Sequence, residues 1–361
     1  MVEKTNSKER LAFHASKQQW PNEINIFVAL VVIILIFELL GVFIMGQSFL
    51  LDSRDRFDSI FNEARLKIII LQVSIIGIIA LGVTQVIICG GIDLSSGSVV
   101  GATAIIAMSF AQVAEVNGQP NPKGVFLHLG WVDLPVIIPV IVGLFCGVLA
   151  GIINGLLIAY ARIPPFIATL GMMVTARGLA KWWFKGKPIS FPIESYTFFG
   201  NGLGGWMPVI FFVGLAILFH FVLKYTVYGK HTYAIGSNEE ASRMSGIKVR
   251  RHKVLVYTIA GLLAALAAIV LSSKNLTAQA GMGVMYELDA IAMAVIGGVS
   301  LAGGRGSIVG TVLGALIFGV IISGFTFMRL DAYYQEMVKG AIIVGAVVLD
   351  QWRQRRAASR I

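Results

Sequence analysis

Residues 68–88 read IIILQVSIIGIIALGVTQVII, a stretch without a single charged side chain. A helix of this length can cross the hydrocarbon core of a bilayer, which takes about 20 apolar residues. A hydropathy window of about that width finds such segments along the whole chain. They are residues 26–46, 68–88, 97–114, 135–160, 165–184, 207–223, 254–273, 288–303, 308–328 and 337–350. The sequence therefore predicts an all-α integral membrane protein with about ten transmembrane helices.

The composition supports this class. Of the 361 residues, 57% are apolar and only 13% are charged, whereas a soluble domain carries about 25% charged residues. The 40 glycines suit helices that pack closely in a membrane. Cys89 and Cys146 both lie in apolar segments, so we interpret them as small buried side chains. Their number and spacing predict neither a disulfide nor a metal site.

The segments outside the bilayer predict the orientation. Residues 1–23 form a polar N-terminal segment, and the apolar run after it is too long for a cleaved signal peptide. A transmembrane domain over 24–350 and a basic tail over 351–361 follow. Most Lys and Arg residues fall on one side if both termini and the loop 224–253 are cytoplasmic. The net charge of +10 then reflects topology and anionic lipid headgroups, not nucleic-acid binding.

A weak internal repeat is the next signal. Gly90–Ala102 resembles Gly297–Thr311, with two residues inserted in the second copy. Apolar helices interrupted by glycine in repeated positions are typical of transporters. The helix count places both copies on the same side, whereas a re-entrant segment between them would make them inverted.

Helices broken inside a membrane protein must lie in protein or line a cavity. Asp93 stands at such a break, where it can cap the following helix or line a substrate path. Neutral hydrogen-bonding groups on nearby apolar segments either join helices or form an uncharged lining, which suits a neutral polyhydroxy substrate and argues against an ion channel. Glu38 is interpreted as a structural contact. The translocation-path candidates are Gln85, Asp93, Ser95, Ser96, Asn154 and Thr169.

The longest soluble loop, Tyr225 to Lys253, contains a short helix with clear end signals. Ser237 and Glu240 have the spacing of a capping box, Asn238 is an alternative cap, and Gly246 can end the helix. This punctuation predicts an exposed docking helix, and the alternative is a helix lying on the membrane surface. The predicted docking residues are Ser237, Asn238, Glu239, Glu240, Ala241, Ser242, Arg243, Met244, Ser245 and Gly246.

Several long motifs stand in a characteristic order along the chain. They are Gly90-Gly91-Ile92-Asp93-Leu94-Ser95, Pro164-Pro165-Phe166-Ile167-Ala168-Thr169-Leu170-Gly171-Met172, Arg177-Gly178-Leu179-Ala180, Tyr228-Gly229-Lys230 to Gly246-Ile247, and Tyr286-Glu287-Leu288-Asp289-Ala290-Ile291 to Gly303-Gly304-Arg305-Gly306. Through these motifs the chain resembles, over about residues 26–350, the permease subunit of bacterial ATP-binding-cassette importers for ribose, galactose, xylose and inositol. The inositol-type branch is resembled by Ser96, where many of these permeases have Val, and by Gly281-Met282-Gly283 and Phe325-Thr326-Phe327.

The resemblance implies an importer subunit in the bacterial inner membrane. Two permease subunits would form the pathway, an ATPase would dock on the coupling helix 238–246, and a periplasmic protein would deliver a neutral sugar or polyol, with inositol favoured. No G-x-x-x-x-G-K-[ST] motif is present, so ATP and Mg would bind the partner ATPase, and this chain is expected to have no cofactor and no catalytic residue. The alternatives are an ion-coupled transporter that uses Glu38 and Asp93, and a passive polyol channel.

Overall fold

The structure is a computed structural model that describes residues 22–51 and 61–358. The predicted N-terminal segment up to residue 21 and the last three residues of the predicted tail lie outside the described residues.

The described chain is mainly helical. Two short antiparallel pairs complete it, β1 (Glu115–Val116) with β2 (Gln119–Pro120) and β3 (Ile189–Ser190) with β4 (Thr277–Ala278). The helices are α2 (Asn22–Leu40), which continues as the π-helix η1 (Gly41–Met45), α3 (Glu63–Ile88), α4 (Ser96–Phe110), the 3₁₀-helix η2 (Leu127–Leu129), α5 (Ile137–Ala159), α6 (Pro165–Trp183), α7 (Glu194–Gly205), α8 (Met207–Tyr225), α9 (Val227–Ser237), α10 (Glu239–Met244), α11 (Val249–Asn275), α12 (Tyr286–Ile296), α13 (Ile308–Phe327) and α14 (Ala332–Ala358).

Each of the ten predicted apolar segments overlaps a helix, although 288–303 is helical only as far as Ile296. Within the described residues, six helices are long and apolar enough to cross a membrane: Glu23–Met45, Glu63–Ile88, Ile137–Ala159, Met207–Tyr225, Val249–Asn275 and Ile308–Phe327. The all-α membrane class is therefore confirmed, while the count of ten spans stays a prediction. The helices α4 and α12 are short, with 15 and 11 residues, or about 22 and 16 Å. Neither can cross about 30 Å of hydrocarbon alone.

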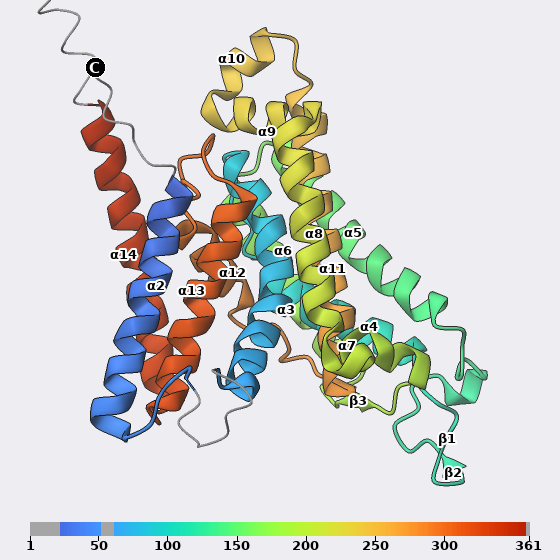
Figure 1. Cartoon of the computed structure of the whole chain (residues 1–361). Helices are drawn as coiled ribbons and strands as arrows, with labels where there is room; N and C mark the ends of the chain where they lie inside the picture. Colours follow the sequence, from blue (N-terminus) through green and yellow to red (C-terminus); the bar gives the residue numbers. More distant parts are fainter. Residues whose placement is uncertain (1–21, 52–60, 359–361) are drawn as a thin grey trace, which may run out of the picture.

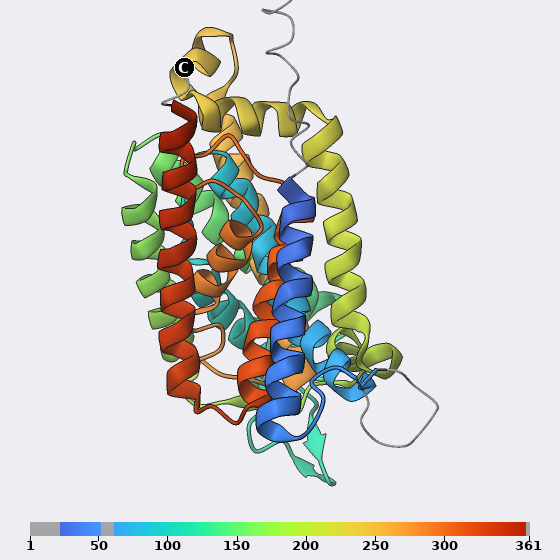
Figure 2. The ribbon, with the colours of Figure 1, turned by 60° about the vertical axis from the view of Figure 1, so that its left-hand side comes forward.

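The helices form one bundle with two distinct ends (Figures 1 and 2). At one end, which we call the α10 end, α9 lies across the bundle and α10 projects beyond it. The β1–β2 hairpin and the β3–β4 pair lie at the other, the hairpin end. The start of α2 and the end of α14 both lie at the α10 end (Figure 1). The described parts of the chain therefore begin and finish on the same side of the bundle.

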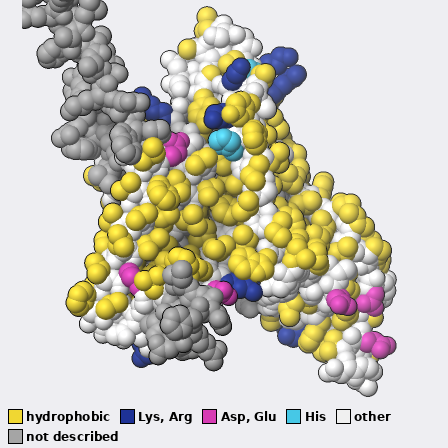
Figure 3. Space-filling view, in the orientation of Figure 1, with side chains coloured by type: hydrophobic (Ala, Val, Ile, Leu, Met, Phe, Trp, Pro, Cys, Tyr) yellow, Lys and Arg dark blue, Asp and Glu magenta, His cyan; other side chains and the backbone are white. Residues whose placement is uncertain are grey.

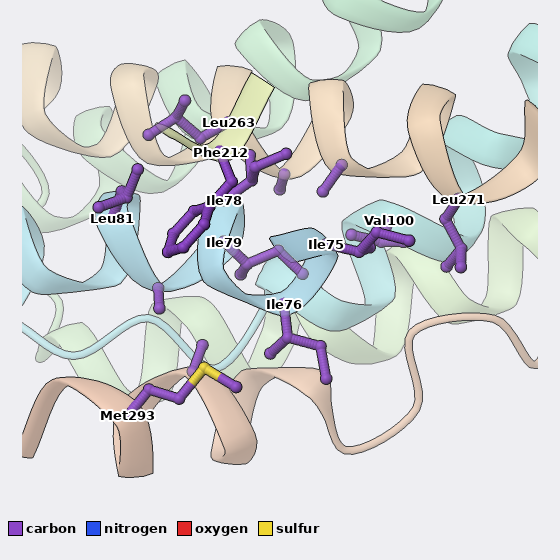
Figure 4. Close-up of a cluster of buried hydrophobic side chains, with 14 of the residues drawn as sticks. Ile75, Ile76, Ile78, Ile79, Leu81, Val100, Phe212, Leu263, Leu271 and Met293 are labelled. Carbon is purple, nitrogen blue, oxygen red and sulfur yellow. The ribbon is translucent and has the colours of Figure 1, made fainter. Parts of the chain in front are cut away.

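Helix α3 is the centre of the core. From Val73 to Ile88 every one of its residues is buried, the pattern of a helix enclosed by others on all sides. Figure 4 shows its isoleucines against side chains from four other helices: Leu263 and Leu271 of α11, Phe212 of α8, Val100 of α4 and Met293 of α12. This contact arrangement holds the two short helices α4 and α12 inside the bundle, against α3.

The outer surface of the bundle is apolar. Phe145 on α5 and Ile217 on α8 are more than half exposed, as are many other large apolar side chains on the outer helices. Figure 3 shows such side chains over the body of the bundle, with Lys and Arg gathered near α9 and α10. A surface of this kind is stable in contact with lipid, because lipid tails are as apolar as the side chains.

Candidate functional site

Two helix pairs in the bundle run in opposite senses. Helix α3 rises to the α10 end, the chain turns back through residues 89–95, and α4 descends from inside the bundle (Figure 1). Helix α11 descends to the hairpin end, the chain turns back through β4 and the following turns, and α12 rises from inside the bundle. The pairs α3–α4 and α11–α12 thus form an inverted arrangement of one long and one half-length helix, a pattern that transporters use around a central site.

The predicted glycine repeat is a different feature. Its two copies are helix C-terminal turns at the same end of the bundle, and they have the same geometry. Gly90 and Gly298 both have a φ of 83°, and Gly91 N–H donates to Val86 O as Val299 N–H donates to Ala294 O. Both turns are Schellman motifs. The sequence alignment paired Gly90 with Gly297, whereas the structure pairs it with Gly298. The copies lie at one end, as the helix count predicted, so the inversion lies elsewhere.

The predicted docking helix is present as α10, which is shorter than predicted. Its cap is Asn238, whose side chain accepts from Ala241 N–H at 2.9 Å. The capping-box prediction for Ser237 is wrong, because this residue ends α9 and its hydroxyl donates to Tyr233 O. Gly246, with a φ of 85°, follows the helix in the left-handed conformation, as predicted. The loop 224–253 is itself helical, since α11 already begins at Val249.

The outer face of α10 is exposed and fixed in place. Met244 is 81% exposed, and Glu240 and Arg243 form an ion pair on the same face. Glu239 is joined to Lys253 of α11 at 2.6 Å. Ser242 is buried against the bundle, and its hydroxyl donates to Asn238 O. An exposed Met beside paired charges on a held helix is a surface that can bind another protein.

Helix α9 connects α10 to both glycine turns. A Cβ built on Gly236 would overlap Ile88 O in the first turn and lie 2.6 Å from Gly304 N. Tyr233 donates to Gly306 O at 2.8 Å, and burial raises the pKa of the Tyr233 hydroxyl. A displacement of α10 can therefore be transmitted by α9 to the end of α3 and to the loop between α12 and α13, because α9 contacts both directly.

The half-helices α4 and α12 meet at their N-terminal ends. A Cβ on Gly97 would overlap both Gly283 O and Glu287 Oε2, so the two backbones are in direct contact. Arg177 of α6 holds the segment that leads into α12, since its Nη1 donates to Ala280 O at 2.5 Å and to Met282 O at 2.9 Å. We call this place the half-helix junction, defined by residues 93–97, Asn154, Arg177 and residues 280–287.

Polar side chains converge on the junction from three other helices. Asp93 accepts from both the N–H and the hydroxyl of Ser95, at 2.8 and 2.6 Å, and Asn154 of α5 donates to the same hydroxyl at 2.9 Å. The hydroxyls of Thr169 on α6 and Tyr257 on α11 each lie 3.4 Å from Ile92 O, and the Thr169 hydroxyl donates its shorter bond, at 2.9 Å, to Pro165 O. Asp93 therefore binds the N–H group of Ser95, the residue just before α4. The Ser95 side chain makes no capping hydrogen bond to the first turn of α4.

Three buried polar atoms at the junction have no hydrogen-bond partner within the described part of the chain. They are Ser96 Oγ, Asn154 Oδ1 and Glu287 Oε2, and their residues are 2%, 1% and 7% exposed. Buried polar groups are normally paired, and each exception needs an explanation.

The structure thus brings five of the six predicted path residues to one place: Asp93, Ser95, Ser96, Asn154 and Thr169. Gln85 makes its hydrogen bonds elsewhere, to Leu81 O and to the Tyr228 hydroxyl. Glu38 is a structural acceptor, as interpreted, because its Oε2 receives the N–H groups of Phe49 and Leu50.

Sequence reasoning missed Glu287 and the backbone contacts of Arg177. Two signals were available, the acid in Tyr286-Glu287-Leu288 at the start of an apolar run and an Arg inside a predicted span. Charged groups at such depth are expensive and mark functional sites. The structural reason for the omission is that only the fold brings residues 93–97 and 280–287 together.

Comparison with known proteins finds similarity to permease components of transport systems. Residues 65–347 match the model of the family described as branched-chain amino acid transport system / permease component. The chain is 43% identical over 284 residues to the ribose import permease protein of Bacillus subtilis (strain 168), covering 78% of this chain and 82% of the relative. It is 36% identical over 292 residues to the ribose import permease protein of Escherichia coli (strain K12), covering 79% and 85%.

A third relative is the galactose/methyl galactoside import permease protein of Haemophilus influenzae, 35% identical over 298 residues, covering 80% of this chain and 87% of the relative. No solved structure matches the chain.

Proposed function

This chain belongs to the permease family of ATP-binding-cassette sugar importers, and from this premise we propose that it carries a neutral monosaccharide or cyclic polyol across the membrane when a partner ATPase acts on α10. The chain is a transport subunit and not an enzyme, and it is a multi-pass protein of the inner membrane. ATP and Mg would be held by the ATPase, and two copies of this chain would form the pathway.

One observation carries the docking proposal. Helix α10 is exposed on its outer face, with Met244 81% exposed, and the helix before it contacts both glycine turns. A partner that moves α10 would therefore move the glycine turns that follow α3 and α12. A surface helix that only rests on lipid headgroups would need none of these contacts.

The orientation is part of the proposal. The described ends of the chain lie at the α10 end (Figure 1), so an ATPase on α10 requires both termini to be cytoplasmic. The Lys and Arg side chains near α9 and α10 (Figure 3) fit this placement. The hairpin end would then face the periplasmic protein that delivers the sugar.

Docking can be tested with Glu240→Lys and Met244→Asp in one variant. Both side chains are exposed, so the fold and the membrane insertion should persist, while ATPase pull-down and sugar-stimulated ATP turnover should fall. The matched control makes the same kinds of change at the hairpin end, Glu115→Lys with Leu129→Asp, both also exposed. It is read by ATPase pull-down alone, because sugar-stimulated turnover also depends on the protein that would bind at that end. Unchanged pull-down and turnover in the α10 variant would refute the docking role.

Inositol is the substrate we propose to test first. Two of the three features behind that hypothesis, Ser96 and residues 281–283, lie together at the half-helix junction. The relatives reported above are named for ribose and galactose, so these sugars belong in the same assay. Uptake of labelled sugars by cells expressing the permease, its ATPase and its binding protein decides between them. Transport of ribose or galactose alone would exclude only inositol.

A further inference from the structure

Cationic side chains surround a pocket that lies where α10 ends and α11 begins, and we call it the α11 pocket. Its volume of about 460 Å³ is within the range of about 300–1,000 Å³ that is typical of small-molecule sites. Ser245 and Gly246 bound it on one side, so it lies beside the docking helix and not on the outer face that carries Met244. The other lining residues are His231 of α9, Ile247, Lys248, Arg251, His252 and Leu255.

The positive charge of the α11 pocket is not balanced by acids of the same chain. Lys248 and Arg251 are exposed, and neither forms an ion pair within the described residues. The two acids of α10 are already paired, one with Lys253 and the other with Arg243. The first turn of α11 holds no acid, although the positive end of a helix dipole favours one. An anion in the pocket would therefore relieve the repulsion between these cations.

His252 lines the pocket in a fixed orientation and has one ring nitrogen to spare. The residue is 8% exposed, and its Nε2 lies 2.8 Å from Thr232 Oγ1. The Thr232 hydroxyl donates its only proton to Tyr228 O, so the Nε2–H group of His252 must be the donor. The other nitrogen, Nδ1, makes no hydrogen bond within the part of the chain that the structure describes. A polar atom of a buried side chain without a partner needs an explanation, and a ligand in the pocket supplies one.

The position of the pocket along α11 matches the level of lipid headgroups. From Lys248 to Leu255 the helix rises by about 10 Å, and the apolar part of α11 predicted from the sequence begins at residue 254. Leu255 is 46% exposed, so the pocket adjoins the apolar flank of the bundle. Figure 3 shows a His side chain beside Lys and Arg in this region, next to the apolar body. Basic side chains at this level of a membrane attract anionic lipids.

We propose that the α11 pocket binds a phosphate group, with Lys248 and Arg251 contacting its oxygens. Charge-assisted hydrogen bonds from Lys and Arg are the strong contacts of phosphate. His252 Nδ1 accepts from a ligand hydroxyl when it carries no proton and donates to a phosphate oxygen when it does.

Anionic lipids and soluble phosphate compounds share this group. The exposed Leu255 favours the lipid, because it offers an apolar surface to an acyl chain. An acidic segment of a partner protein would use the same cations but would need no such wall. The proposed orientation places the pocket at the cytoplasmic surface, and the binding measured below does not depend on that orientation.

The test removes two charges from the pocket and, in a matched control, two charges beside it. Lys248→Gln with Arg251→Gln removes the phosphate contacts. Lys230→Gln with Arg250→Gln removes the same charge at exposed sequence neighbours of lining residues that do not line the pocket themselves. Native mass spectrometry of the full chain in detergent measures the binding of phosphatidylglycerol.

The pocket variant should bind phosphatidylglycerol more weakly than the wild type by roughly tenfold or more, the effect of one or two lost hydrogen bonds to a charged group. The control variant should bind it as the wild type does. Lys248→Arg with Arg251→Lys keeps both charges and should retain most of the binding. Pull-down of the ATPase should be equal in all four proteins, because the outer face of α10 is unchanged.

Inorganic phosphate identifies the source of the group. If it does not displace phosphatidylglycerol from the wild type, the pocket takes the lipid. If it displaces the lipid and binds alone, with the same dependence on Lys248 and Arg251, the pocket takes a soluble phosphate compound. Either result supports the phosphate site.

Three results would overturn the proposal. Equal loss of binding in the pocket variant and the control variant would show attraction by surface charge alone. Unchanged binding in the pocket variant would show that Lys248 and Arg251 do not contact the lipid. Unchanged binding together with weaker ATPase pull-down would assign these cations to an acidic segment of the ATPase. None of these measurements involves sugar uptake, so the proposed function is tested separately.

Discussion

The backbone N–H of Gly304 donates a hydrogen bond to the carbonyl oxygen of Ile88 at 2.8 Å. The bond joins the end of α3 to the loop between α12 and α13, two segments far apart in the sequence. Gly236 of α9 packs directly over it. These contacts form one compact joint beneath α10, and its tightness depends on glycine at positions 236 and 304.

The first prediction concerns this joint. Gly236→Ala adds a methyl group that overlaps Ile88 O, and backbone atoms cannot rotate away as a side chain can. We expect a loss of about 1–3 kcal/mol in stability from overpacking and a clear fall in sugar-stimulated ATP turnover. Gly214→Ala on α8 is the control, because its Cβ would meet nothing within 4 Å. Thermal unfolding in detergent measures the stability, and an ATPase assay measures the sugar-stimulated turnover. Equal stability and equal turnover in the two variants would contradict the prediction.

The second prediction concerns topology. A reporter fused after Arg250 should read cytoplasmic, and one placed within residues 120–130 should read periplasmic. The two sites lie near opposite ends of the bundle, at the start of α11 and beside the β1–β2 hairpin (Figure 1). Reversed readings at both sites would overturn the orientation and the docking argument with it.

The third prediction separates ATP-driven transport from ion-coupled transport. Glu38 accepts two backbone N–H groups, so Glu38→Gln, which keeps an acceptor, should retain uptake. Glu38→Ala should lower stability by about 1–3 kcal/mol, because it leaves buried donors unpaired. Uptake by the Glu38→Gln variant in cells with ATP maintained and the ion gradient collapsed is the measurement. Abolished uptake there would favour the ion-coupled alternative.

The fourth prediction concerns the ion pair between Asp289 of α12 and Lys339 of α14, at 3.0 Å with the Asp side chain 4% exposed. Lys339→Met leaves an uncompensated buried carboxylate, which should cost about 3–5 kcal/mol. Adding Asp289→Asn should restore much of that loss, since the pair is then neutral. Thermal unfolding of the two variants tests this, and a double variant no more stable than the single one would count against it.

The sequence predicted the helices well because their signal is local. An apolar run such as 68–88 carries its own evidence for a membrane helix, and the Asn238 cap and Gly246 are read from a few neighbouring residues. The same local signal explains the glycine repeat. The turns after α3 and α12 have similar sequences because both are C-terminal helix turns of the same geometry. The repeat therefore does not mark the inverted pairs α3–α4 and α11–α12.

The inverted relation between the pairs α3–α4 and α11–α12 could not be predicted from neighbouring residues. The segments that lead into α4 and α12, residues 89–95 and 277–285, share little beyond glycine and a nearby acid. Their likeness lies in chain direction and in the point at which the half-helices begin. Only tertiary packing defines these, so Glu287 and Arg177 stayed outside the predicted site while Asp93 and Ser96 were within it.

The half-length of α4 and α12 has a mechanical consequence. Each ends at a different end of the bundle, α12 at the α10 end through Gly298 and α4 at the hairpin end, and their first turns touch at Gly97 and Gly283. A displacement of either half-helix is therefore passed on to the other, so the two ends of the bundle are mechanically coupled through a contact that only glycine permits.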